Sequence, residues 1–156
     1  MMQDNAAIPK DCAFGLWVSV LYRSAHVYFS KILKPYSLGP GQQAYLLAIY
    51  PGEIITQETL ARRLLVDKAN VARAVGALAG LGYVERVLSE ADARERLVRL
   101  TEDGRKVRNE VESYASAWVN ELKQAAGDDT WQVFEKELEH IAKHAAEYAR
   151  SISAPY

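Results

Sequence analysis

The sequence predicts a mainly α-helical fold with a small β-wing, in which a winged helix-turn-helix core is joined to N- and C-terminal helices that form a dimerisation bundle. Three observations predict this class: two short helical patterns meet at Leu65 and Val66, a basic hairpin pattern follows at once, and long amphipathic patterns occupy both ends. The predicted parts are a winged helix-turn-helix DNA-binding domain over 36–100, dimerisation helices over 11–34 and 101–150, and a flexible arm over 1–10.

The second short helix of the core is predicted to begin at Asp67 and to end at Gly82. The Asp67 carboxylate can accept hydrogen bonds from the free amides of the first turn, and glycine readily adopts a left-handed cap. Apolar residues repeat at steps of three and four on one face: Val71, Val75, Leu78 and Leu81. The start of the other face carries small, amide or cationic groups: Lys68, Ala69, Asn70 and Arg73. These groups suit base edges and phosphates better than a core.

Two short, branched and basic runs follow this helix, over residues 83–87 and 97–100. The segment between them is polar and is predicted to turn through residues 91–96. Such a pattern indicates a β-hairpin. A helix followed directly by a basic hairpin is the arrangement in which the helix enters a major groove of DNA and the hairpin reaches a neighbouring minor groove.

The segments before the core are predicted to be helical. A long helix should end near Lys34, because Pro35 disfavours helix in the residue before it. A second helix is expected to have Pro40 near its first turn and to run through Ile49. Thr56 is then expected to cap a short helix over residues 57–64.

The segments after the hairpin are predicted to form two long helices. Thr101 should cap the first, and residues 127–129 should break it. The last helix carries apolar residues at alternating steps of three and four: Trp131, Phe134, Leu138, Ile141, Ala145 and Tyr148. This spacing is typical of a coiled-coil seam, so the terminal helices are expected to meet a second subunit.

Length and composition favour one globular domain with helical extensions, since the chain has 156 residues and is 25% charged. No apolar run approaches the roughly 20 residues of a membrane span, and the N-terminus has no secretory pattern. The single cysteine, Cys12, excludes an internal disulfide framework and fits a reducing cytoplasm.

The formal net charge of −1 hides an uneven distribution. Residues 62–108 hold 11 Lys and Arg against 7 Asp and Glu, whereas residues 109–156 hold 4 against 9. Positive charge is therefore concentrated on the predicted recognition helix and hairpin, as expected for a surface that meets nucleic acid.

The order of elements and several segments resemble the MarR family of bacterial transcription regulators. The similar segments are residues 38–42 (LGPGQ), 55–64 (ITQETLARRL), 67–73 (DKANVAR), 82–86 (GYVER), 92–94 (DAR) and 100–104 (LTEDG). The resemblance extends over roughly residues 14–150. It implies a homodimer that binds a pseudo-palindromic operator in double-stranded DNA, often as a repressor released by a small effector.

The resemblance also implies roles for particular residues. By matching positions, Lys68, Asn70 and Arg73 would meet the major groove, and Arg94 would enter the minor groove. Asp92 would orient the wing. Two departures weaken the expected wing contact: Ala93 stands where many members have another cation, and Glu95 adds a negative charge beside Arg94.

Other DNA contacts are weighed against simpler roles. Arg96 and Arg99 could contact DNA or pair with Glu90 or Glu95. Arg62 and Arg63 could form a solvated helix end or reach one phosphate. Thr56 and Gln57 begin a helix whose free amides could meet a phosphate, although Thr56 is first of all a cap.

An effector site is expected around Arg23, Gln43, Trp17 and Tyr45. Arg23 lies in an apolar stripe of the first helix, where a guanidinium needs an anionic partner. That partner could be an acid of the other chain or the carboxylate of a small aromatic effector. The aromatic residues could instead belong to the core.

Further chemistry is not expected. Cys12 is interpreted as an inert thiol rather than a redox sensor, and His140 and His144 as part of a polar strip rather than a metal site. No cofactor motif or catalytic motif is found, which argues against an enzyme. The alternative function is a winged-helix protein–protein interaction module that does not read DNA; the operator and the effector are left open.

Overall fold

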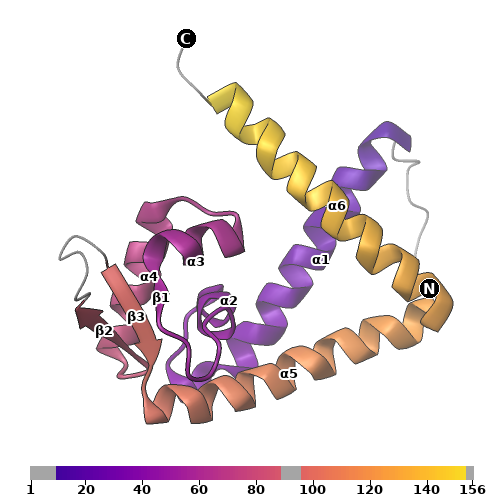
Figure 1. Ribbon diagram of the computed structural model, residues 1–156. Coiled ribbons are helices and arrows are strands. Elements are labelled where there is room, and N and C mark those ends of the chain that lie inside the picture. The colour runs from indigo at the N-terminus through magenta and orange to yellow at the C-terminus, as the bar shows by residue number, and fades with distance from the viewer. Residues whose placement is uncertain (1–9, 89–95, 154–156) are drawn as a thin grey trace. The chain divides into compact units, whose positions relative to one another are not determined.

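The computed structural model describes residues 10–88 and 96–153 (Figure 1). Six α-helices, one short 3-10 helix and three strands are present there, in the order α1 (Lys10–Ile32), η1 (Lys34–Tyr36), α2 (Gln42–Leu47), β1 (Ile55–Thr56), α3 (Gln57–Leu64), α4 (Lys68–Gly80), β2 (Val84–Leu88), β3 (Arg96–Leu100), α5 (Glu102–Ala126) and α6 (Asp128–Ser153). The mainly helical fold with a small wing is thus confirmed. None of the helices in these ranges is long and apolar enough to cross a bilayer.

The chain divides into two compact units, Met1–Gly41 and Gln42–Tyr156. The first contains α1 and η1. The predicted end of the first helix is nearly correct, because α1 ends at Ile32 and Pro35 lies inside the following 3-10 turn. Proline is compatible with that turn, since it occupies an early position where a helix needs no donor from it.

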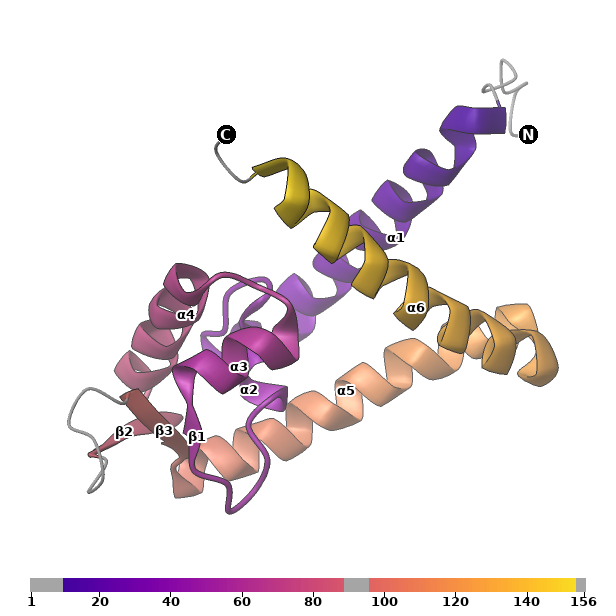
Figure 2. The same ribbon diagram turned by 45° about the horizontal axis from the view of Figure 1, so that its top comes forward.

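The second unit is built around α2, α3, α4 and the sheet (Figure 2). α2 packs against α3, α4 and α5, while α4 packs against α3 and β2. Large apolar residues from these elements are fully buried: Leu46, Ile49, Leu60, Val71, Val75, Leu78, Val98 and Val111. The predicted apolar face of the recognition helix is therefore confirmed at Val71, Val75 and Leu78.

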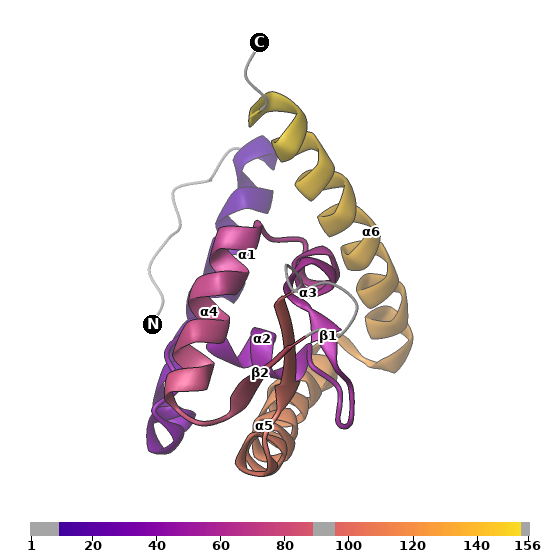
Figure 3. The same ribbon diagram turned by 60° about the vertical axis from the view of Figure 1, so that its left-hand side comes forward.

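The sheet has the strand order β1-β3-β2, with both pairings antiparallel (Figure 3). Val84 faces Leu100 and Leu88 faces Arg96 across the hairpin. The predicted turn through residue 96 is wrong, because Arg96 already pairs in β3. Strand β1 was not predicted at all: two residues give too short a pattern, and only the tertiary pairing of Ile55 with Val98 creates it.

Three predicted helix caps are confirmed by hydrogen bonds. The side chains of Thr56, Asp67 and Thr101 accept from the backbone amides of Thr59, Asn70 and Gly104, respectively. The second predicted helix was wrong at both ends. α2 begins at Gln42, two residues after Pro40, and ends before Ile49.

Thr101 joins the start of α5 to the residues that directly follow α4. Its hydroxyl donates to the Gly82 carbonyl at 2.6 Å, and its amide donates to the Tyr83 carbonyl at 3.0 Å. Gly82 has a φ of 77°, the left-handed region that favours glycine. A Cβ on Gly104 would lie 1.8 Å from the Tyr83 carbonyl oxygen, so only glycine allows this close approach.

Replacing Gly104 with alanine should therefore destabilise the fold by about 3 kcal/mol or more, because the added methyl group must displace backbone. Gly76→Ala is the control, since a Cβ there meets nothing within 4 Å. The free energy of unfolding of Gly76→Ala should be unchanged or higher by up to about 1 kcal/mol, because alanine has a better helix propensity than glycine. Urea denaturation followed by circular dichroism measures both, and equal stability of the two variants would refute the contact.

Candidate nucleic-acid interface

The helix-turn-helix is formed by α3, a tight turn and α4. Leu65 adopts a left-handed conformation with a φ of 55°, and the amide of Val66 donates to the Ala61 carbonyl at 3.1 Å. This turn closes α3 and aims the next residues into α4. Leu60 and Val71 are both fully buried between the two helices and the rest of the unit. The orientation of α4 is thus held by its buried face, and its other face is free to carry contacts.

The front of α4 carries an ordered chain of polar groups. Asp67 accepts from the Asn70 amide at 2.7 Å and from the Asn70 side chain, and the Asn70 Oδ1 accepts from a guanidinium nitrogen of Arg73. Arg73 is exposed, whereas Val71 and Val75 on the other face are buried. The cap residue therefore positions two of the predicted DNA contacts, Asn70 and Arg73, on one exposed face.

Lys68 lies at the first position of α4 and forms an ion pair with Glu58 of α3, at 3.1 Å. Both side chains are more than half exposed, at 72% and 59%. An ion pair this exposed contributes little free energy. Lys68 can therefore exchange Glu58 for another anion at small cost.

The predicted contacts on α3 have different surroundings. Arg62 is exposed and donates to the Thr59 hydroxyl at 3.0 Å. The Thr56 hydroxyl caps the helix by accepting a hydrogen bond from the Thr59 amide, and Gln57 is only 8% exposed. The structure thus presents Arg62 to solvent, while Thr56 and Gln57 form the start of the helix.

Arg63 belongs to a structural anchor that the sequence did not reveal. It donates to both carboxylate oxygens of Glu53, at 2.9 and 2.8 Å, and to the Ala48 carbonyl. Its guanidinium also lies 4.3 Å from the centre of the Tyr50 ring. These contacts hold the loop after α2 against α3, so Arg63 is engaged in the fold.

Arg108 of α5 forms a second anchor. It is 7% exposed and donates to the carbonyls of Ile49 and Leu47, at 3.1 and 3.3 Å, and to Glu112 at 2.9 Å. Carbonyls at a helix end need such donors. The spacing of Gly104, Arg108 and Val111 places them on one helix face, and this was the available sequence signal for burial.

The two strands of the wing carry several arginines. Arg99 pairs with Glu85 at 2.7 Å. The other partners suggested by the sequence, Glu90 and Glu95, lie outside the described residues. Arg96 is exposed at the start of β3. The predicted minor-groove residue Arg94, with Asp92 and Ala93, lies outside the described residues.

The four predicted effector residues belong to different units. In α1, Arg23 is exposed and lines an open hollow of about 450 Å³ with Ser24, Val27 and Tyr28, and Trp17 is 57% exposed. In α2, Tyr45 is half-buried, and the Gln43 Oε1 atom is buried with no hydrogen-bond partner in the described parts of the chain.

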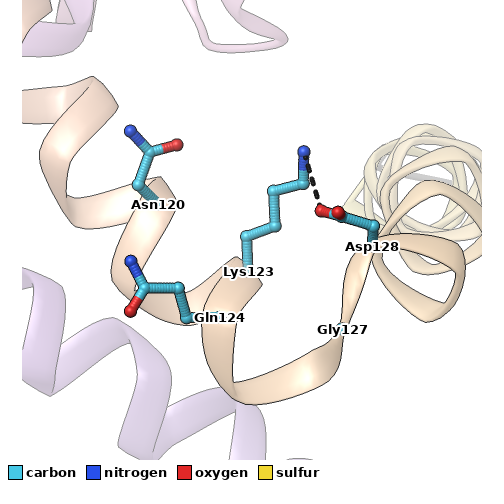
Figure 4. Close-up of a pocket in the computed structure, with 5 residues that line it drawn as sticks. All are labelled: Asn120, Lys123, Gln124, Gly127 and Asp128. Carbon is cyan, nitrogen blue, oxygen red and sulfur yellow. Dashed lines mark ion pairs between the residues drawn. The ribbon is translucent and has the colours of Figure 1, made fainter.

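The bend between α5 and α6 forms another hollow (Figure 4). Gly127 breaks the helix there, and Lys123 pairs with Asp128 across the break at 3.2 Å. Among the described residues that line the hollow, Lys123 and Asp128 are the charged ones, and this ion pair joins them. Within residues 10–88 and 96–153, no three side chains of a metal-binding type gather, whether around His140 and His144 or elsewhere.

α3, the turn, α4 and the β2–β3 hairpin together define a winged helix-turn-helix protein. A family model described as MarR family matches residues 38–95. A MarR transcriptional regulator from Methanosarcina mazei Go1 is 31% identical, with 92% of this chain and 95% of that chain covered and a TM-score of 0.76. The chain belongs to the MarR family of transcriptional regulators.

Two further comparisons agree. HTH-type transcriptional regulator BilQ of Clostridioides difficile (strain CD3) is 29% identical over 123 residues, which cover 79% of this chain and 82% of BilQ. A MarR protein from Peptoclostridium difficile shares the fold, with 22% identity, a TM-score of 0.85, and coverage of 97% and 100% of the two chains. The relatives are named as regulators, which at the level of the family indicates a regulator and not an enzyme.

The Arg63 hydrogen bonds hold the pKa of the Glu53 carboxyl below its ordinary value. This anchor therefore stabilises the fold fully above about pH 4.3, the ordinary Glu pKa, and its contribution is lost as the pH falls through the lower folded-state value. We expect Glu53→Gln to cost about 1 kcal/mol at pH 7 and much less near pH 3.

Urea denaturation at a series of pH values measures this difference. Glu139→Gln is the control, because Glu139 also has a lowered pKa, caused by Lys143, but is fully exposed to screening solvent. A Glu53→Gln deficit that stays constant from pH 7 to pH 3 would contradict the role of the ion pair.

Proposed function

We propose that the protein is a sequence-specific DNA-binding regulator that acts as a homodimer on a pseudo-palindromic operator, as a repressor released by a small effector. The observation that carries the proposal is the exposed Arg73, hydrogen-bonded to Asn70 on the face of α4 opposite buried Val75. A cation and an amide held together on an exposed helix are suited to reading base edges.

The remaining cations are suited to positioning contacts. Lys68 and Arg62 are exposed on the two helices of the helix-turn-helix and would meet phosphates. Arg96 begins the wing strand that follows the predicted minor-groove residue Arg94. A known structure with this fold supports the general arrangement: FabT of Streptococcus pneumoniae, 19% identical with a TM-score of 0.71, was crystallised in complex with DNA.

The exposed apolar faces support a dimer. In α6, Phe134, Leu138, Ile141 and Tyr148 are 40–63% exposed on one predicted seam. In α1, Phe14 is 66% exposed. Monomeric soluble proteins rarely expose large apolar residues in continuous rows, so a second copy of the chain is the expected cover.

The effector is proposed to be small and either aromatic or anionic. Arg23, in the first unit, offers a guanidinium to an anionic group in its open hollow. Independently, Gln43 in the second unit has a buried side-chain oxygen that accepts no hydrogen bond from the described residues, and a ligand donor would recover the free energy that such an atom costs. A neighbour in fold, PcaV of Streptomyces coelicolor, 22% identical with a TM-score of 0.78, was crystallised with its natural ligand.

Arg73→Ala should weaken binding to the operator by about 1–3 kcal/mol, which is roughly 5- to 150-fold, and should weaken binding to an unrelated duplex less. The operator is first selected from random duplexes with the wild-type protein, and binding is followed by fluorescence anisotropy. Lys143→Ala removes an exposed cation from α6 and should change neither affinity. If the wild-type protein selects no sequence and binds no duplex, this proposal is wrong and the interaction-module alternative is favoured.

Ile141→Glu should convert the dimer to a monomer, because it places a charge in the apolar row of α6. Lys143→Glu changes a neighbouring position on the exposed polar side of that helix and should leave the dimer intact. Sedimentation velocity measures the mass, and circular dichroism checks that both variants are folded. A monomeric wild-type protein would contradict the proposed assembly, and a dimeric Ile141→Glu would exclude this face of α6 from it.

A further inference from the structure

A second cationic surface lies on the inner face of the hairpin. Arg86 stands opposite Val98, and Leu88 stands opposite Arg96. Arg86 shares a face with Val98 because the two lie directly opposite each other, and Arg96 shares that face because alternate residues of a strand do. Both arginines therefore project on the same side as buried Val98. They line a groove of about 350 Å³ together with Gln57 at the start of α3 and Ala72 of α4.

The two arginines of this groove have no protein partner in the described parts of the chain. Neither forms an ion pair or a side-chain hydrogen bond there. Arg99, on the outer face of the same hairpin, pairs with Glu85 at 2.7 Å. Two like charges beside one groove repel each other, and a guanidinium has several donors to satisfy. Within the described residues, no carboxylate neutralises these two guanidinium groups, so both can donate to an anion on the inner face.

We propose that this groove seats one phosphate of the DNA backbone, with Arg86 and Arg96 donating to its oxygens; this rests on the proposed function. Guanidinium groups match the geometry of phosphate oxygens and can donate two bonds to them. The groove is also close to the recognition surface, because Ala72 precedes Arg73 directly on α4. When a helix lies in the major groove, the phosphate backbones run along both of its sides.

The seat would position the wing. A phosphate held between β2, β3 and the start of α3 fixes how the hairpin approaches the duplex, but it carries no information on base sequence. Arg86 is thereby assigned a role that complements the base contacts of α4. Loss of this contact should lower the affinity for the operator and the affinity for unrelated DNA by the same factor.

The test compares Arg86→Ala with wild type on the selected operator and on an unrelated duplex, over a series of salt concentrations. We expect about a tenfold loss of affinity on both duplexes. The slope of log K against log salt should fall by about 0.9, the value for one phosphate contact. Arg86→Lys should keep most of the slope, since it keeps the charge. It should lose part of the affinity, since lysine lacks the two parallel donors of the guanidinium group.

Arg99→Ala is the matched control, since it removes an arginine from the same hairpin on its outer face, and it should leave the slope unchanged. An unchanged slope and affinity for Arg86→Ala, with wild-type protein binding DNA, would overturn the seat and leave the proposed function standing. Wild-type protein that binds neither duplex would instead overturn the proposed function and the seat with it.

A second experiment distinguishes binding of a DNA phosphate from binding of a free anion. Inorganic phosphate is titrated at constant ionic strength while the Arg86 side-chain NMR signal is followed. The proposal expects only weak binding of the free ion, with competition against DNA. Tight, Arg86-dependent binding of inorganic phosphate that leaves DNA affinity unchanged would make the groove a site for a free anion and would refute the seat.

Discussion

The close approach of Gly104 to the Tyr83 carbonyl is the contact on which the geometry of the wing depends. Four chain segments meet at this point: the end of α4, the start of β2, the end of β3 and the start of α5. Thr101 joins them by donating to Gly82 and Tyr83 and by capping Gly104. A side chain at position 104 would separate these elements, and the hairpin would then lose its fixed position beside α4.

Two groups of arginines in the second unit differ in their surroundings. Arg63 and Arg108 are bound to carbonyls and to Glu53 or Glu112, and they hold α2 and its following loop to α3 and α5. Arg73, Arg86 and Arg96 are exposed and have no carboxylate partner within residues 10–88 and 96–153. The charges of Arg63 and Arg108 are therefore paired within the fold and stabilise it, whereas the second group remains available to an external anion.

Much of the fold could be predicted because the signals are local. The caps at Thr56, Asp67 and Thr101 follow from one side chain and an amide three residues away, and the buried face of α4 follows from the helical repeat. The exposure of Arg73 could be predicted for the same reason. The errors at Pro40, Ile49 and Arg96 concern ends of elements, where local preference is weak and the tertiary pairing decides.

The sequence by itself determined which segments are helical, where the helices are capped and which face of α4 is buried, since these depend on residues within one or two turns. Only the tertiary structure decided that Arg63 binds Glu53, that Arg108 reaches α2, and that Arg86 and Arg96 share a groove with Gln57. These groups are brought together by strand register and helix packing. Such contacts join residues far apart in the chain, and no local pattern specifies them.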